Sequence, residues 1–321
     1  MHNCKVKSHS PVFVQAEEYN RYKNIVSNEA FFTAIEKAQD EIMRKHHDWE
    51  IRKFQNEFSL PLSRNIFGLY TIPVYINHIK ATFVVDTGAQ ISGIKKDRIH
   101  HFQLRKAPGK LTVGSIGGKN KTLDGFIADA FQMGVIEISN MGLVSLDSKE
   151  FSLRFGNIDL FRFDGIIGWD ILHQLDFEID DIAKKFKVIQ NRFRIPHPNM
   201  IKGSFPCLLT KKANGDIVLF GLDTGSRISW IGEESISKHQ LSVIQEGSAL
   251  GMGVHGVEKL DIKVIKEWKL YLDKAEINLQ NTITGRVDLF EGFRFDGVFG
   301  NDIFHRRRIR VINSAGMVLL A

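Results

Sequence analysis

The chain has 321 residues, with 43 basic and 37 acidic side chains and a formal net charge of +6. Its 43% hydrophobic and 25% charged content is that of an ordinary soluble globular protein, and its length exceeds what one domain usually needs. Because basic and acidic residues are interspersed, the charge favours neither a nucleic-acid nor a membrane surface, and no apolar run approaches the roughly eighteen residues of a membrane helix.

The N-terminal 65 residues predict a helical extension. Between residues 28 and 57 apolar side chains recur at helical spacing, and a shorter helix is expected at residues 17–26. Ser27 or Asn28 is placed to cap the longer helix, and Pro61 lies beyond its end. We expect this block to pack on a lobe or on a partner, and an inhibitory pro-segment or a docking arm is the alternative.

After Phe67 the pattern changes to short β-rich runs separated by turn residues. Strands are expected at residues 70–76, 82–85, 111–113 and 125–131, and in the second half at 208–210, 217–222, 261–264 and 268–272. Asn214-Gly215 is typical of a hairpin turn, because both residues tolerate positive φ. Residues 194–199 contain two prolines and are predicted to form an extended connector between the halves.

Three sequence landmarks occur twice and in the same order. Asp-Thr-Gly stands at residues 86–88 and again at 223–225, each time after an apolar run. A glycine-rich stretch follows in both halves, at 113–118 and 251–256. Phe-Arg-Phe-Asp-Gly-Ile-Ile-Gly at 161–168 then recurs as Phe-Arg-Phe-Asp-Gly-Val-Phe-Gly at 293–300. The pattern predicts an internal duplication with a pseudo-two-fold axis.

On these residues the chain resembles the aspartic proteases of the retropepsin and pepsin clan. Residues 74–80 and 83–89 are similar to the first hairpin and catalytic loop of a retroviral protease, 114–118 to its flap tip, and 166–172 to its apolar-apolar-Gly segment and short helix. The likeness spans about residues 69–319. It implies a mostly β fold with two pseudo-symmetric retropepsin-like β-barrel lobes, at residues 66–195 and 196–321, after an α-helical N-terminal extension at 1–65.

Peptide hydrolysis needs a site that takes a proton from water and gives one to the carbonyl oxygen. Two carboxyl groups that share one proton do both, and the aspartic proteases work with such a pair. Asp86 and Asp223 are the residues that a repeated motif places to meet between the lobes. The predicted function is therefore an aspartic endopeptidase that needs no metal and no cofactor.

The residues after each aspartate are predicted to support it. Gly88 and Gly225 are expected to let the backbone turn tightly so that each carboxylate faces inward. The resemblance implies that Thr87 and Thr224 interlock their hydroxyl groups with the backbone of the opposite loop.

The next position differs between the two copies. Ala89 offers Asp86 no side-chain hydrogen bond, whereas the hydroxyl of Ser226 is expected to bond the outer oxygen of Asp223. On this interpretation Asp223 carries more of the negative charge in the free enzyme.

The glycine-rich stretches are predicted to be flap tips, the ends of hairpins that close over a bound peptide. Glycine at a hairpin tip leaves backbone N–H groups free to bond the peptide's carbonyl groups. Because both halves carry such a stretch, the chain resembles a fused retroviral-type dimer. The predicted flap residues are Ser115, Ile116, Gly117 and Gly118 in the first half and Gly253, Val254, His255 and Gly256 in the second.

Other polar residues are expected to be structural. Asp164, Asp170, Asp296 and Asp302 recur with the second motif and are predicted to cap turns and short helices. His46-His47 lacks the spacing of a metal site.

Two other functions stay open, which are a non-catalytic peptide-binding or regulatory module and a protease that activates itself by removing residues 1–65. The expected partner is a peptide or protein substrate, with no nucleic acid and no membrane, and a monomer is the default. Cys4 and Cys207 form no disulfide framework, and residues 1–5 lead into no signal-peptide core, so a cytoplasmic protein is expected.

Overall fold

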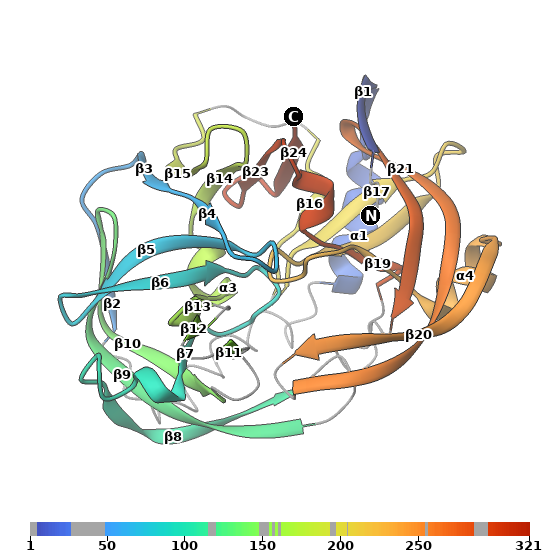
Figure 1. The fold of residues 1–321 in the computed structure, drawn as a ribbon. Coiled ribbons are helices and arrows are strands. Elements are labelled where there is room, and N and C mark those ends of the chain that lie inside the picture. Colours follow the sequence, from blue (N-terminus) through green and yellow to red (C-terminus); the bar gives the residue numbers. More distant parts are fainter. Residues whose placement is uncertain are drawn as a thin grey trace.

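The computed structural model describes residues 5–26, 49–114, 120–147, 154–155, 158–159, 162–192, 197–203, 205–253, 256–285 and 295–321. Within these ranges the chain is mostly β, which confirms the predicted fold class (Figure 1). The helical elements are short: α1 (Ala16–Val26), α3 (Trp169–Leu172), α4 (Glu233–His239) and the 3-10 turns η1 (Lys96–Arg98) and η2 (Asn301–Phe304).

The first half of the chain builds a nine-stranded sheet in the order β2-β10-β7-β13-β6-β5-β9-β8, with β4 paired to β5. Its strands are β2 (Glu50–Lys53), β4 (Ser63–Arg64), β5 (Tyr70–Ile76), β6 (Ile79–Val85), β7 (Gly93–Lys95), β8 (Arg105–Gly114), β9 (Asn120–Met133), β10 (Ile136–Leu146) and β13 (Gly165–Ile167). The tight β5–β6 hairpin turns at Asn77 and His78, whose φ values of +47° and +67° suit a type I′ turn.

The second half builds an eight-stranded sheet with the same central arrangement. Its strands are β1 (Lys5–Val12), β16 (Met200–Ile201), β17 (Cys207–Lys211), β18 (Ile217–Leu222), β19 (Trp230–Gly232), β20 (Val243–Gly253), β21 (Gly256–Gly285) and β22 (Gly297–Phe299). In the first sheet β13 lies parallel to β6 and antiparallel to β7. In the second sheet β22 lies parallel to β18 and antiparallel to β19.

A third, five-stranded sheet joins the two halves. Its order is β24-β23-β14-β15-β3, and its strands are β3 (Phe58–Pro61), β14 (Asp176–Asp180), β15 (Lys185–Ile189), β23 (Arg308–Ile312) and β24 (Met317–Leu320). The central pair is antiparallel, with Glu178 of β14 opposite Arg310 of β23. Figure 1 shows this sheet between the other two. The remaining described pair is β11 (Arg154–Phe155) with β12 (Ile158–Asp159).

One hydrophobic cluster runs through both halves and supports the strands that end at the Asp-Thr-Gly loops. On the first side Phe83 packs edge-on against Phe131, with ring centroids 5.6 Å apart. On the second side Phe220 stacks on Phe299 at 4.2 Å. The strands β6 and β18 are therefore anchored by large buried rings just before the motif.

Several predicted elements agree with the structure. The strands expected at residues 70–76 and 217–222 are β5 and β18, with the same ends, and the helix expected at 17–26 is α1, which begins one residue earlier. The turn at Asn214-Gly215 is confirmed, but only Gly215 has positive φ, at +90°. It closes a β-turn in which the Gly215 N–H donates to the Lys212 carbonyl at 3.0 Å.

Two element predictions need correction. The residues expected as strands at 261–264 and 268–272 are strand, but without a break between them: both belong to the 30-residue strand β21, which pairs with β20, β1, β17 and β19 along its length. Residues 50–53 form strand β2 where the tail of the long helix was expected, because they pair with β10 and tertiary pairing overrides a local helical pattern. The part of that helix at residues 27–48 lies outside the described residues.

The N-terminal 65 residues contribute strands to all three sheets. β1 joins the second sheet, β2 and β4 the first, and β3 the third. Helix α1 packs on the second half, where the Tyr19 hydroxyl donates to the Met200 carbonyl at 3.2 Å and Lys211 lies 2.8 Å from Glu18. The extension is thus mixed in secondary structure and built into the fold, and the domain boundaries themselves stay predictions.

Val14, between β1 and α1, tests this packing, because its side chain is 3% exposed in a cluster with Cys207 and Leu209. We expect Val14→Ala to lower the free energy of unfolding by about 2 kcal/mol, from two buried methyl groups and the cavity they leave. The neighbouring Gln15 is exposed, so Gln15→Ala is the matched control and should change it by less than about 0.5 kcal/mol. Urea unfolding measures both, and equal losses would mean that the extension is not held by this cluster.

Candidate active site

Each Asp-Thr-Gly loop leaves the end of a central strand. Asp86 follows β6 and donates its N–H to the Ile167 carbonyl of β13 at 3.0 Å. Asp223 follows β18 and donates its N–H to the Phe299 carbonyl of β22 at 2.9 Å. The two loops are therefore held in the same way by their own sheets.

The two threonines bind the loops to each other. The Thr87 hydroxyl donates to the Leu222 carbonyl at 2.6 Å and accepts the Thr224 N–H at 3.0 Å. The Thr224 hydroxyl donates to the Val85 carbonyl at 2.7 Å and accepts the Thr87 N–H at 3.0 Å. Both threonine residues are fully buried. This is the interlock that the resemblance implies.

The interlock brings the two aspartate side chains together, so that each carboxyl group lies against the glycine that follows the other aspartate by two residues. Asp86 Oδ1 also accepts the N–H groups of Gly88 at 2.8 Å and Ala89 at 3.0 Å. Asp223 Oδ1 accepts the Gly225 N–H at 2.8 Å.

The glycines are required for space rather than for a special turn. Neither Gly88 nor Gly225 is among the described residues with positive φ. A Cβ atom at Gly88 would lie 2.4 Å from Cγ of Asp223, and one at Gly225 would lie 2.3 Å from Cγ of Asp86. Any other residue at either position would push the carboxyl groups apart.

Burial raises the pKa of both carboxyl groups. The negative charge of Asp86 raises the pKa of Asp223 further, so that it stands well above its usual range. The backbone N–H groups of Gly88 and Ala89 act in the opposite direction on Asp86 and stabilise its ionised form. The pair therefore retains one proton where isolated aspartates have lost theirs.

The expectation for Ser226 is wrong. Its hydroxyl donates to the Ile228 carbonyl within its own loop, at 2.9 Å, and has no proton left for Asp223. Backbone N–H groups donate to the two carboxyl groups instead, two at Asp86 Oδ1 and one at Asp223 Oδ1, and side-chain identity does not reveal them.

A matching pair of hydrogen-bond networks supports the loops from behind. In the first half Ser92 Oγ donates to Asp170 at 2.7 Å and accepts the Gly168 N–H at 3.0 Å. In the second half Ser229 Oγ donates to Asp302 at 2.6 Å and accepts the Gly300 N–H at 3.0 Å. The serines are those of the repeated Ile-Ser that follows each Asp-Thr-Gly.

The other repeated aspartates hold strands together. Asp164 accepts the Thr82 N–H at 2.9 Å, and Asp296 accepts the Leu219 N–H at 3.0 Å. Burial raises the pKa of Asp296, but bonds from His239 and Lys238 outweigh it and lower the pKa to about 2. The structural role predicted for these aspartates is confirmed, although they anchor strands and loops more than they cap helices.

Two long hairpins lie where the flaps were predicted. β8 pairs with β9 from Arg105 opposite Ile127 to Gly114 opposite Asn120, and β20 pairs with β21 as far as Gly253 opposite Gly256. Figure 1 shows both hairpins reaching from opposite sides toward the middle of the molecule. The predicted tip residues Ser115, Ile116, Gly117, Gly118, Val254 and His255 lie outside the described residues.

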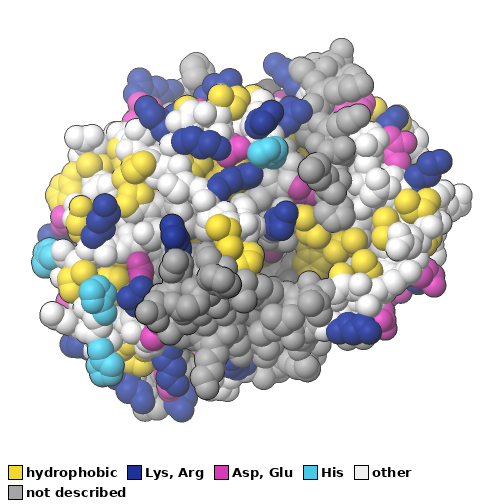
Figure 2. All heavy atoms as spheres, viewed as in Figure 1, with side chains coloured by type: hydrophobic (Ala, Val, Ile, Leu, Met, Phe, Trp, Pro, Cys, Tyr) yellow, Lys and Arg dark blue, Asp and Glu magenta, His cyan; other side chains and the backbone are white. Residues whose placement is uncertain are grey.

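In the described part of the chain, no three His, Cys, Asp or Glu side chains are grouped so as to hold a metal ion. Nor does that part contain a helix with the length and apolar character needed to cross a membrane. On the face in Figure 2, Lys and Arg side chains are interspersed with Asp and Glu.

The sequence profile of a family described as aspartyl protease matches residues 72–171, which contain the first Asp-Thr-Gly and the segment through α3. The predicted relationship to aspartic proteases is therefore confirmed. Among solved structures, the chain is similar to a retropepsin-like aspartic protease from Rickettsia conorii, at 20% identity over 44% of this chain and 92% of that chain, with a TM-score of 0.28. It is also similar to an aspartic proteinase from Irpex lacteus, at 10% identity over 83% and 97%, with a TM-score of 0.49. No curated protein sequence matches the chain.

Thr224 provides a test of the interlock. Thr224→Val keeps the side-chain shape but leaves the Thr87 N–H and the Val85 carbonyl unpaired in a buried place, so we expect a loss of about 2–4 kcal/mol in the free energy of unfolding. Thr224→Ser keeps the hydroxyl and should lose only about 1 kcal/mol, from one methyl group. Urea unfolding compares the two variants, and similar losses would show that the hydroxyl bonds contribute little.

The raised pKa values of the aspartate pair predict a pH dependence of stability. The folded state holds a proton that the unfolded state releases near pH 3.9, so the free energy of unfolding should fall as pH rises from about 4 through the folded-state pKa, by about 1.4 kcal/mol per pH unit. The double variant Asp86→Asn, Asp223→Asn lacks this contribution. Urea unfolding of both proteins from pH 3 to pH 8 measures the difference, and parallel curves would contradict the shared proton.

Proposed function

We propose that the protein is an aspartic endopeptidase that hydrolyses peptide bonds with a water molecule activated between Asp86 and Asp223. The observation that carries the proposal is that the two carboxyl groups, one from each half, each lie against the glycine of the opposite Asp-Thr-Gly loop, where Thr87 and Thr224 join the loops. The family match to residues 72–171 supports a peptidase role in general.

In the proposed reaction Asp86, ionised, takes a proton from the water as its oxygen attacks the peptide carbonyl carbon. Asp223, protonated, gives its proton to the carbonyl oxygen, so that a neutral diol forms. Asp86 then gives the proton it has gained to the amide nitrogen as the C–N bond breaks, and a diol hydroxyl returns a proton to Asp223 as the new carboxylic acid forms. The roles follow from the hydrogen bonds that favour the charge on Asp86.

The two hairpins β8/β9 and β20/β21 are proposed to cover the bound peptide from both halves. Their repeated position, with the matching central strands, supports an origin by internal duplication of a retropepsin-like unit. Because one chain supplies both aspartates, catalysis would not need a second copy, and a monomer is proposed. The expected cytoplasmic location stays a prediction.

The test is cleavage of a peptide library made by digesting a proteome, with products identified by mass spectrometry. We expect Asp86→Asn and Asp223→Asn each to lower kcat/KM by about 10³-fold, within the range of general acid–base catalysis. Asp216→Asn, which changes a surface aspartate paired with Lys212 outside both hairpins, is the matched control and should keep full activity. In H₂¹⁸O, one ¹⁸O atom should enter each new carboxyl terminus.

Equal cleavage by the wild-type protein and the double variant Asp86→Asn, Asp223→Asn would refute the proposal and indicate a contaminating protease. Peptide binding without cleavage between pH 3 and pH 8 would favour the alternative, a non-catalytic peptide-binding module.

A further inference from the structure

The two Asp-Thr-Gly loops are supported by equivalent residues of different chemistry. Asp181 follows β14 and Asn313 follows β23, and these positions are 132 residues apart, as are the repeated motifs at 161 and 293. Each one holds the element behind the opposite half's loop. Asn313 donates through Nδ2 to the carbonyls of Leu172 and Leu175, at 3.1 and 2.5 Å, at the end of α3.

Asp181 binds the chain beyond η2 in the corresponding way, but through a carboxylate instead of an amide. Its side chain is fully buried, and its Oδ2 accepts the Arg306 N–H at 2.7 Å, just beyond η2. Its own N–H donates to the Arg307 carbonyl at 3.0 Å. A residue of the first half thus hydrogen-bonds the backbone of the second half just after η2 ends.

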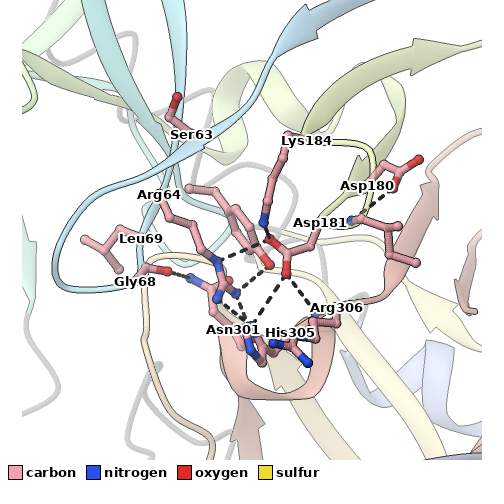
Figure 3. Close-up of polar contacts among 12 residues, drawn as sticks. Ser63, Arg64, Gly68, Leu69, Asp180, Asp181, Lys184, Asn301, His305 and Arg306 are labelled. Carbon is pink, nitrogen blue, oxygen red and sulfur yellow. Dashed lines mark hydrogen bonds and ion pairs between the residues drawn. The ribbon is translucent and has the colours of Figure 1, made fainter.

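Three cationic or titratable side chains surround this carboxylate (Figure 3). Lys184 Nζ lies 2.7 Å from Oδ1, Arg64 Nε lies 3.4 Å from Oδ1, and His305 Nδ1 lies 3.5 Å from Oδ2. Burial raises the pKa of Asp181, but the bonds from Lys184 and the Arg306 N–H outweigh it and leave the pKa below its usual range. The buried Asp181 side chain is therefore an ionised carboxylate with cationic partners, and its charge is compensated.

The start of η2 holds the second Asp-Thr-Gly loop. Asn301 is 2% exposed, and its Nδ2 donates to the Thr224 carbonyl at 2.8 Å and to the Gly68 carbonyl at 3.4 Å. Its backbone N–H donates to the Ser226 carbonyl at 2.8 Å. Figure 3 shows Asn301 and the Asp181 group side by side, with Arg64 between them.

The equivalent position in the first half makes no such side-chain bond to its loop. The residue equivalent to Asn301 is Trp169, whose N–H donates to the Ala89 carbonyl at 2.7 Å but whose indole Nε1 donates away, to the Gly203 carbonyl. Arg64 strengthens the second support further, because its Nη2 donates to the Tyr70 hydroxyl at 2.6 Å and reaches the Asn301 carbonyl at 3.5 Å. Among the residues that the structure describes, only the second Asp-Thr-Gly loop is thus connected to a group of ion pairs in the other half. The connection runs through the four residues of η2, from Asn301 at its start to the chain that Asp181 binds just beyond its end.

We propose that Asp181 and Asn301 are positioning residues that fix Asp223 against Asp86, and so set the alignment of the acid and the base in the reaction. The inference rests on the proposed function, because it assigns a purpose to the support of that same site. The carboxylate of Asp181 holds the end of η2, Asn301 at its start holds the carbonyl of Thr224, and the neighbouring Asp223 is placed accordingly.

The experiment compares Asn301→Leu and Asp181→Asn with Glu178→Gln. Glu178 is the matched control, because it lies on β14, is 1% exposed, and pairs with Lys187 and Arg310 on strands of the same sheet. We expect Asn301→Leu and Asp181→Asn to lower kcat by about 10- to 100-fold with KM within about twofold, as misplaced catalytic groups do. Glu178→Gln should keep kcat within about twofold, although it also loses thermal stability.

A second measurement does not depend on cleavage. Side-chain carboxyl ¹³C shifts of Asp86 and Asp223, followed from pH 3 to pH 8, report the two steps in which the pair titrates. Asn301→Leu and Asp181→Asn should move these steps by about one pH unit or more, and Glu178→Gln should leave them in place. If Asn301→Leu does not fold, the kcat and the titration of Asp181→Asn alone test the positioning role.

The possible results separate the two proposals. If Asp86→Asn abolishes cleavage while Asn301→Leu and Asp181→Asn leave both kcat and the titration unchanged, the positioning role is wrong and the proposed function stands. If the wild-type protein cleaves no peptide, the proposed function fails, and the titration alone decides whether these residues position Asp223. A kcat loss in Glu178→Gln as large as in Asp181→Asn would reduce the effect to general destabilisation and overturn the inference.

Discussion

The reciprocal bonds between Thr87 and Thr224 are the interaction on which the rest of the structure depends. They place four buried hydrogen bonds between loops from different halves of the chain. Each contributes about 1 kcal/mol net, yet breaking one leaves a buried donor or acceptor at a cost of about 1–3 kcal/mol. Two carboxyl groups left to themselves would ionise and separate. The interlock holds the two groups together, which favours retention of one proton by the pair.

The three sheets serve to keep this contact in register. The outer sheets carry the two loops on the strands β6 and β18, backed by Phe83 and Phe220. The third sheet fixes one half against the other through the pairing of β14 with β23, and the N-terminal residues close all three sheets with β1, β2, β3 and β4. A small displacement of either half is therefore resisted by backbone pairing far from the aspartates, because packed interiors transmit strain instead of absorbing it.

The sequence predicts the repeated parts of this arrangement well, because each repeat is evidence for its partner. The two Asp-Thr-Gly triplets, the threonine interlock and the structural aspartates such as Asp164 follow from the duplicated motifs and the resemblance. What the sequence does not predict are contacts that depend on the meeting of distant segments. Strand β2 exists because β10 is beside it, the need for Gly88 arises from the carboxyl group of the opposite loop, and the Ser226 hydroxyl is used by Ile228, two residues away. None of these three contacts can be recognised from the sequence around the residues that make it.

The proposed reaction requires an acid and a base that differ, whereas two equivalent halves would make the two aspartates alike. Retention of one proton by two equivalent groups breaks the symmetry only on average. Here the surroundings of the two groups differ. Asp86 Oδ1 accepts the N–H groups of Gly88 and Ala89, Asp223 Oδ1 accepts the N–H group of Gly225, and the loop of Asp223 is also held through Asn301 and the ion pairs of Asp181. The two halves thus differ in the residues that support the loops, while the Asp-Thr-Gly triplets themselves are identical.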